Sequence, residues 1–121
     1  MEFPEAVRVL GLQGADLVLV PTANMRDFDA VPHLLVPARA YENRLWVAYA
    51  NACGHDAVFD YGGLSTVADP MGSILAQASR DEDLLTVTLH QGDCGAARGQ
   101  GQWPSRRPEL YEALVRASDF S

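Results

Sequence analysis

The chain has 121 residues, of which 48% are apolar, and carries a formal charge of −7. These values predict one globular domain with a modest core, and they argue against nucleic acid or an anionic membrane surface as a partner. No apolar run reaches the ~18 residues that a membrane-spanning helix needs, and the acidic start does not resemble a signal peptide, so we expect a cytoplasmic protein.

The first thirty residues predict a helix, a strand and a polar loop. Residues 4–13 are expected to form a helix, because Pro4 suits a first helical turn and Gly14 suits a helix end. Residues 15–20 form a short apolar run, which is typical of a strand buried on both faces. The polar residues 22–29 then predict a loop at the carboxyl end of that strand, where ligand sites gather in α/β sheets.

The middle of the chain predicts a second helix and a second strand. Residues 31–45 favour a helix, with Pro37 as a possible break. Residues 46–52 are aromatic and small apolar residues that favour a strand. The order strand, helix, strand implies a parallel pair joined by a right-handed crossover.

The C-terminal half predicts an antiparallel meander, a loop and a last helix. Segments 64–68, 73–78 and 84–90 are apolar, are separated by turn residues and predict three strands. Residues 91–105 hold four glycines, so we expect a long loop or partial disorder. Residues 108–117 favour a final helix with one apolar face.

The two cysteines and three histidines show no metal-type or catalytic spacing. Cys53 and Cys94 are too few for a disulfide framework, and we expect each to be a free structural thiol. Cys53 lies at the end of a predicted strand, a plausible place for a nucleophile, but a reactive thiol needs an electropositive neighbourhood. His33, His55 and His90 could act as bases, although their scattered positions favour structural or solvated roles.

Five short segments occur in a recognisable order. They are Phe3-Pro4-Glu5, residues 14–24, residues 37–43, Gly63-Leu64-Ser65 with Asp69-Pro70-Met71-Gly72, and residues 107–111. In this order they resemble the carbon–nitrogen hydrolase (nitrilase) superfamily. The opening residues 2–5 and the loop 61–65 look closest to its bacterial amidases.

The resemblance implies an α/β fold. The family fold is a four-layer α-β-β-α sandwich with helices flanking two sheets, and residues 1–121 would form its latter half as a single partial domain. The absent strands would leave a sheet face uncovered, which promotes association. We therefore expect the isolated chain to be poorly stable, to form a homo-oligomer, or to pair with a complementary half.

The resemblance also implies a mechanism without a cofactor or a metal. Family members hydrolyse small carboxamides or nitriles through a cysteine thioester, with a glutamate as general base and a lysine that stabilises the tetrahedral intermediate. All nine basic residues of this chain are arginines, and arginine does not replace a catalytic lysine. The cysteine would precede Met1 by three residues, so none of the three catalytic residues is assigned here and the chain alone is expected to be inactive.

Five residues are candidates for the substrate pocket by the same resemblance. Thr22, Ala23, Asn24 and Met25 match the family segment that lines the pocket, and Glu5 matches a glutamate close to the nucleophile. The alternative for Asn24 is a hydrogen bond within its own turn. The alternative for Glu5 is an acidic residue in the first turn of a helix.

Three charged residues are candidates for an interface. In the family, the helices that match residues 5–13 and 34–44 contribute to a dimer contact, which suggests Arg8, Arg39 and Glu42. Glu42 could instead be a general base, or form an ion pair with a nearby arginine of its helix. Two other functions stay open: a non-catalytic interaction subunit, and a small domain that binds amide-like ligands without turnover.

Overall fold

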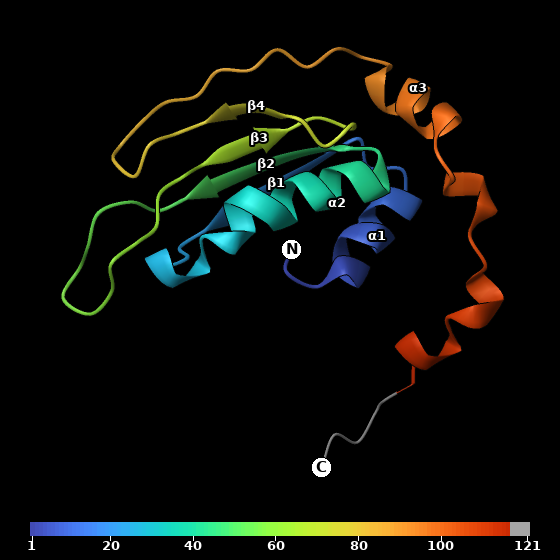
Figure 1. Cartoon of the computed structure of the whole chain (residues 1–121), viewed down its shortest axis with the longest axis horizontal. Coiled ribbons are helices and arrows are strands. Elements are labelled where there is room, and N and C mark those ends of the chain that lie inside the picture. Colours follow the sequence, from blue (N-terminus) through green and yellow to red (C-terminus); the bar gives the residue numbers. More distant parts are fainter. Residues whose placement is uncertain (117–121) are drawn as a thin grey trace.

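A computed structural model describes residues 1–116 and shows one mixed sheet with helices on one side (Figure 1). The four strands lie in the order β1 (Leu17–Thr22), β2 (Trp46–Asn51), β3 (Thr66–Ala68) and β4 (Ile74–Gln77). β1 and β2 are parallel, whereas β3 is antiparallel to both of its neighbours. The predicted α/β class and the parallel first pair are therefore confirmed.

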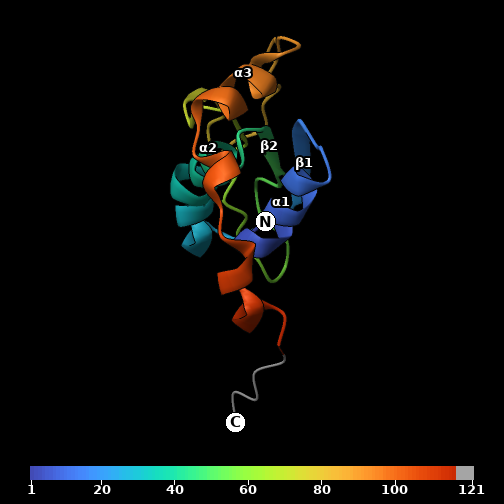
Figure 2. The ribbon, with the colours of Figure 1, turned by 90° about the vertical axis from the view of Figure 1, so that its right-hand side faces the viewer.

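Helix α1 (Pro4–Leu12) and helix α2 (Val36–Asn43) cover one face of the sheet (Figures 1 and 2). A π-helical turn, Val31–Leu35, runs directly into α2. Pro37 therefore does not end the predicted helix but marks the start of its regular α-helical part, where a missing amide hydrogen costs little.

The core lies between the two helices and the sheet. Val18 and Val47 face this layer, and they pack with Val7 of α1 and Val36 of α2. On the other face of β1, Leu19 is 68% exposed. The expectation that this strand is buried on both faces is therefore wrong for the chain as described, because helices cover only one side of the sheet.

Two predictions for residues 84–105 were wrong. Residues 84–90 form no strand, and the meander ends at β4. The glycine-rich stretch forms helix α3 (Asp93–Gln100) instead of a loop, because Cys94 and Ala97 are buried against the body of the protein. Burial of an apolar helix face outweighs the low helix propensity of glycine.

The predicted helix over 108–117 is replaced by short 3-10 turns, and its last residue lies outside the described part of the chain. Its apolar face stays exposed: Leu110 is 66% and Leu114 is 62% accessible. A helix of this length is stabilised mainly by packing, which this segment lacks here. The 3-10 turns of the structure are Arg26–Phe28, Trp103–Ser105, Pro108–Leu110 and Glu112–Leu114.

Gly63 packs too closely against the backbone of Arg80 to carry a side chain. Gly63 has φ of +62°, and a Cβ atom there would lie 2.7 Å from the Cα and O atoms of Arg80. We expect Gly63→Ala to lower the free energy of unfolding by about 2 kcal/mol through clash and backbone strain. Gly14→Ala is the control, because Gly14 has φ of +93° with no atom within 4 Å. Equal losses in urea unfolding would contradict the role of the clash.

Candidate functional site

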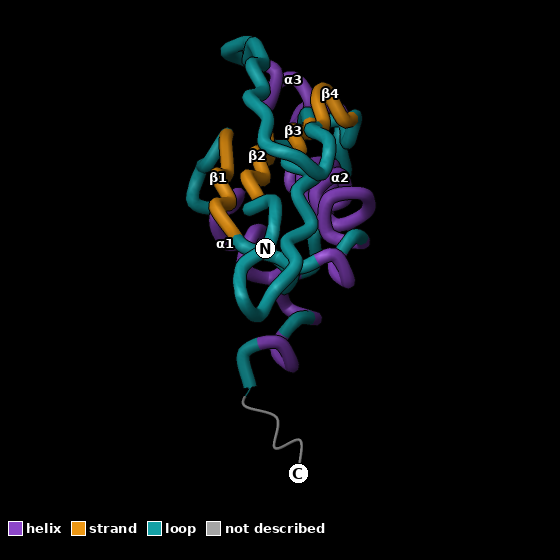
Figure 3. The backbone as a smooth tube through the Cα atoms, turned by 90° about the vertical axis from the view of Figure 1, so that its left-hand side faces the viewer, coloured by secondary structure: helices purple, strands orange, loops and turns teal. Residues whose placement is uncertain are grey.

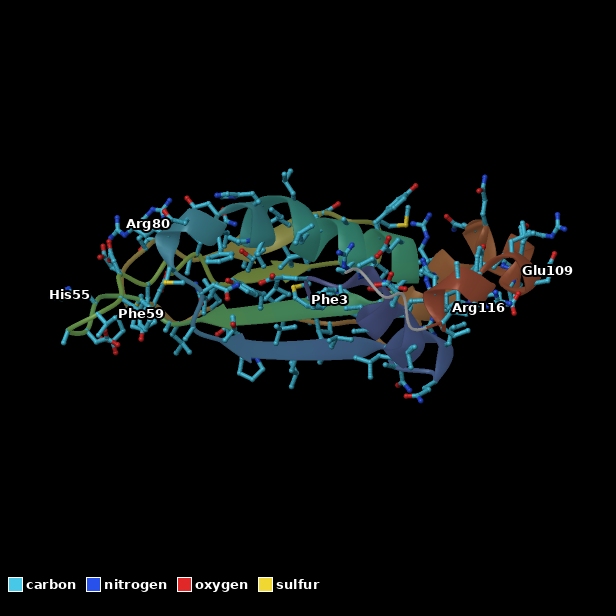
Figure 4. The ribbon with its side chains drawn as sticks, turned by 90° about the horizontal axis from the view of Figure 1, so that it is seen from below. Phe3, His55, Phe59, Arg80, Glu109 and Arg116 are labelled. Carbon is cyan, nitrogen blue, oxygen red and sulfur yellow. The ribbon has the colours of Figure 1, made fainter. Side chains whose placement is uncertain are left out.

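The candidate site lies where three strands end at the same edge of the sheet. β1, β2 and β4 run in one direction, so the segments that follow them meet there. Figure 3 looks at the molecule from this end and shows loops in front of the strands. Figure 4 shows Arg80, which follows β4, at the same end as His55 and Phe59 of the loop after β2. Such strand ends are the usual ligand sites of α/β sheets.

Asn51, the last residue of β2, joins two of these loops. Its Oδ1 accepts a 2.7 Å hydrogen bond from the backbone N–H of Asn24, and its Nδ2 donates to the carbonyl oxygens of Asn24 (3.1 Å) and Gly63 (2.9 Å). All the hydrogen-bonding directions of this amide except one are thus used to hold backbone. Sequence reasoning missed Asn51, although the parallel register places it beside Thr22.

The structure brings four of the five pocket candidates together. The Thr22 hydroxyl donates to Oδ1 of Asn24 (3.3 Å), and the N–H of Gly62 donates to the Asn24 carbonyl (2.9 Å). Met25 forms an isolated antiparallel bridge with Tyr61. Ala23 is exposed between them. The side-chain N–H₂ group of Asn24 lies next to the Tyr49 hydroxyl, and its other N–H has no acceptor among the described residues, so the loop presents a donor for a ligand.

Tyr49 lies beneath this loop, on the helix-covered face of β2. Its side chain is 2% exposed, and its hydroxyl has no hydrogen-bond partner within residues 1–116. Burial raises the pKa of the Tyr49 hydroxyl, and the neighbouring Asn24 side chain offsets part of that rise. The phenol therefore stays protonated, and it lies beneath Asn24 shielded from solvent.

An ion pair ties the loop after β1 to the segment after β4. Arg80 donates to both carboxylate oxygens of Asp29, at 2.5 and 3.1 Å, and to the carbonyl oxygen of Gly62 at 3.2 Å. The hydrogen bond from Arg80 lowers the pKa of Asp29. This bidentate pair holds the loop after β1 against the segment after β4.

The Asp29 carboxylate predicts how stability depends on pH. Its pKa is lowered in the folded chain, so its contribution is present above the unfolded pKa of about 3.9 and is lost as pH falls through the folded value. We expect the difference in unfolding free energy between the parent and Asp29→Asn to shrink below about pH 4. Urea unfolding at several pH values measures it, and a difference that stays constant down to low pH would refute the prediction. Arg80→Gln should remove the same pH dependence.

The fifth pocket candidate lies elsewhere. Glu5 is exposed on α1 and lines a hollow of about 540 Å³ between α1, α2 and the C-terminal turns, which residues 22–25 do not reach. Its place in a substrate pocket stays a prediction. Arg8 and Glu42, two of the interface candidates, line the same hollow.

Arg39, the third interface candidate, is 7% exposed and acts within the chain. Its Nε donates to the carbonyl oxygen of Met1 (3.1 Å), one terminal nitrogen donates to that of Glu2 (2.8 Å), and the other contacts Glu42 (3.2 Å). The ion-pair alternative for Glu42 is thus the arrangement observed. A dimer contact through these residues stays a prediction.

The cysteines and histidines form no catalytic group in the described structure. Cys94 is buried, its thiol donates to the carbonyl oxygen of Asp16 at 3.3 Å, and burial raises its pKa, which disfavours a thiolate. Cys53 is half-buried after β2, and His55 and His90 are exposed. Across residues 1–116, no three His, Cys, Asp or Glu side chains are placed to hold a metal ion. None of the helices in that range is long and apolar enough to cross a membrane.

Comparison with known proteins gives consistent matches. The carbon–nitrogen hydrolase family model matches residues 1–99. A Pseudomonas protegens protein, "Hydrolase in pqqF 5'region", is 49% identical over 117 residues, which are 96% of this chain and 41% of that protein. The citrullinase of Francisella tularensis is 35% identical and is covered over 44% of its length. The chain thus spans less than half the length of these relatives.

Solved structures of nitrilase-superfamily amidases share the fold. A variant of the Nesterenkonia AN1 amidase superposes with a TM-score of 0.80 and 40% identity, over 94% of this chain and 40% of the amidase. Another variant of that amidase was solved in complex with butyramide. A family model that spans most of the sequence, together with a relative that is 49% identical over almost all of it, shows that this chain belongs to the carbon–nitrogen hydrolase family.

Proposed function

We propose that this chain forms the part of a small-carboxamide hydrolase that carries the substrate loop 22–25. The observation that carries the proposal is the loop itself: two hydrogen bonds with Asn51 hold Asn24, a third ties Asn51 to the neighbouring Gly63, and one N–H of the Asn24 side chain has no acceptor among the described residues. An amide N–H donor in an accessible loop is suited to bind the carbonyl oxygen of an amide substrate. The similarity to an amidase solved with butyramide supports the same substrate class.

The catalytic groups of the proposed reaction are not assigned to residues 1–121. The chain contains no lysine, and Cys94 is buried with a raised pKa. The glutamate, lysine and cysteine of the family mechanism would therefore come from polypeptide outside this sequence, and the chain by itself is expected to release no ammonia from amides. Nitriles are the second substrate class that the family chemistry allows.

A chimaera tests the proposal. The Pseudomonas protegens relative would supply the polypeptide that lies N-terminal to the region matching this chain. This polypeptide would be joined to residues 1–121, and ammonia release from butyramide would be measured. Turnover by the chimaera and none by the 121-residue chain is the expected result. A folded chimaera without turnover of amides or nitriles would refute the proposed function, and turnover by the chain alone would refute its expected inactivity.

We infer that the uncovered sheet face drives association of the isolated chain. Leu17 and Leu19, which share the outer face of β1, are 38% and 68% exposed. Apolar surface of this kind is normally covered, by a complementary half or by a second copy. Light scattering after size exclusion would measure the association, and a cooperatively folded monomer at all concentrations would argue against it.

A further inference from the structure

Ion pairing divides the arginines of this chain into two groups. Six of the nine arginines contact a carboxylate within 4.0 Å: Arg26, Arg39, Arg80, Arg98, Arg107 and Arg116. The remaining three, Arg8, Arg44 and Arg106, contact no carboxylate within the described residues. In a chain with a net charge of −7, three arginines without carboxylate partners call for an explanation.

The three arginines without carboxylate partners line the same hollow, which has a volume of about 450 Å³. Arg8 comes from α1, Arg44 from the end of α2, and Arg106 from the segment after Trp103. The hollow therefore collects charge from three parts of the chain. Its volume falls in the range of small-molecule sites.

Aromatic rings hold these guanidinium groups in place. Arg8 and Arg106 lie over the ring of Trp103, with their Cζ atoms 4.7 and 5.3 Å from its centroid. Arg44 lies over Tyr41 at 4.0 Å. Stacking orients a guanidinium without using its N–H groups, so the donors stay available for a ligand.

Most of those donors have no partner in the described protein. The guanidinium groups of Arg8 and Arg106 make no hydrogen bond there, and Nε of Arg106 is buried without a partner. Arg44 uses one terminal nitrogen, for long contacts to Pro70 O (3.4 Å) and Met71 Sδ (3.3 Å). A buried donor without an acceptor costs free energy that a bound anion would recover.

The charges around the hollow also favour an anion. Burial lowers the pKa of Arg8, Glu42 opposes this effect, and Arg106 adds to the lowering by repulsion. Glu42 is the one carboxylate of the lining, and its Oε1 contacts Arg39. Three cations face one carboxylate that is already paired, so the hollow keeps an excess of positive charge.

We propose that this hollow is a binding site for a small oxyanion, namely the phosphate or carboxylate group of a small molecule. Guanidinium forks from three directions match the geometry of such groups, because each oxygen can accept from a different arginine. The lining contains none of residues 22–25, so the site is separate from the proposed amide site and does not depend on it.

Calorimetric titration of the 121-residue chain at low ionic strength tests the proposal. Inorganic phosphate and succinate are the two probes, and they distinguish a phosphate from a carboxylate ligand. We expect saturable one-to-one binding of at least one probe. Arg8→Gln and Arg106→Gln should each weaken it by roughly tenfold or more, the effect of losing one charged hydrogen-bonding partner. Arg107→Gln is the matched control: it removes the same charge from the adjacent position, where the arginine is exposed and paired with Glu109.

Specific results would overturn the proposal. Absence of saturable binding of both probes to the parent chain would do so, as would equal weakening by Arg107→Gln. Salt-sensitive self-association that needs Arg8 and Arg106, without binding of either probe, would instead assign the arginines to a carboxylate of a second copy. Circular dichroism of each variant checks the fold, and Arg44→Asn, which suits the left-handed backbone at φ of 51°, gives a further variant if one of the others unfolds. Because binding is measured without amide turnover, failure of this site and failure of the proposed function are distinguishable.

Discussion

Replacing Arg39 with alanine is expected to lower the free energy of unfolding by about 3 kcal/mol. The guanidinium is almost fully buried and holds the carbonyl oxygens of Met1 and Glu2 as well as the carboxylate of Glu42. The variant leaves all three acceptors without their donor, and the carboxylate without its counter-charge. Urea unfolding followed by circular dichroism would measure the loss.

Two comparison variants make this prediction specific. Arg39→Lys should recover only a minor part of the loss, because one ammonium group cannot reproduce a planar fork that reaches three acceptors. Arg107→Ala removes an arginine that is 66% exposed, and it should change stability by less than about 0.5 kcal/mol. If Arg39→Ala were as mild as Arg107→Ala, the segment before α1 would not depend on this clamp.

Replacing Asn51 with alanine is expected to cost about 3 kcal/mol of stability, because three backbone groups lose a partner at the strand-end loops. Asn51→Asp should be at least as harmful, since a carboxylate oxygen would then face the carbonyl oxygens of Asn24 and Gly63. In the chimaera with the Pseudomonas protegens relative, butyramide hydrolysis should fall by about tenfold or more, because a small displacement of a substrate-positioning loop has effects of this size.

The control for Asn51 is a second amide side chain that is exposed to solvent. Gln91 is exposed and makes no side-chain hydrogen bond within the described chain, so Gln91→Ala should leave both stability and turnover nearly unchanged. Loss of stability in Asn51→Ala with undiminished turnover would show that the loop 22–25 does not position the substrate. Unchanged stability would contradict the network itself.

The sequence correctly predicted those elements whose local residue pattern also finds suitable neighbours in the folded chain. The apolar run in β1 and the helix-forming residues of α2 each find the neighbours that their patterns require, so the parallel pair was predictable. Residues 84–90 carry a strand pattern as well, but a strand also needs a partner with free backbone groups, and none pairs with them here.

Long-range contacts explain why helix α3 was not predicted from the sequence. Gly95 and Gly99 disfavour a helix locally, yet α3 forms because Arg98 donates to the carbonyl oxygen of Ala15 (2.6 Å) and pairs with Asp16 (3.0 Å). These contacts join residues more than eighty positions apart in the sequence, and the local glycine content carries no sign of them.

The candidate site was predictable only in part. The resemblance pointed to residues 22–25, and the structure places them at the end of β1 and in the loop that follows it. Asn51 was missed because its role depends on the strand register, which sets it beside Thr22. The hollow lined by Arg8, Arg44 and Arg106 was missed for a similar reason, since Trp103 reaches Arg8 only after the chain has folded back over α1.

The position of β1 at the outside of the sheet has a consequence for fibrillar aggregation. An outer strand exposes backbone groups that can template a strand from another molecule. Pro21 interrupts this template because it has no amide hydrogen to offer. An incoming strand could therefore align without interruption only with residues 17–20, a stretch shorter than the segments of about six residues that form cross-β zippers. Pro21 therefore hinders the growth of stacked sheets from strand β1.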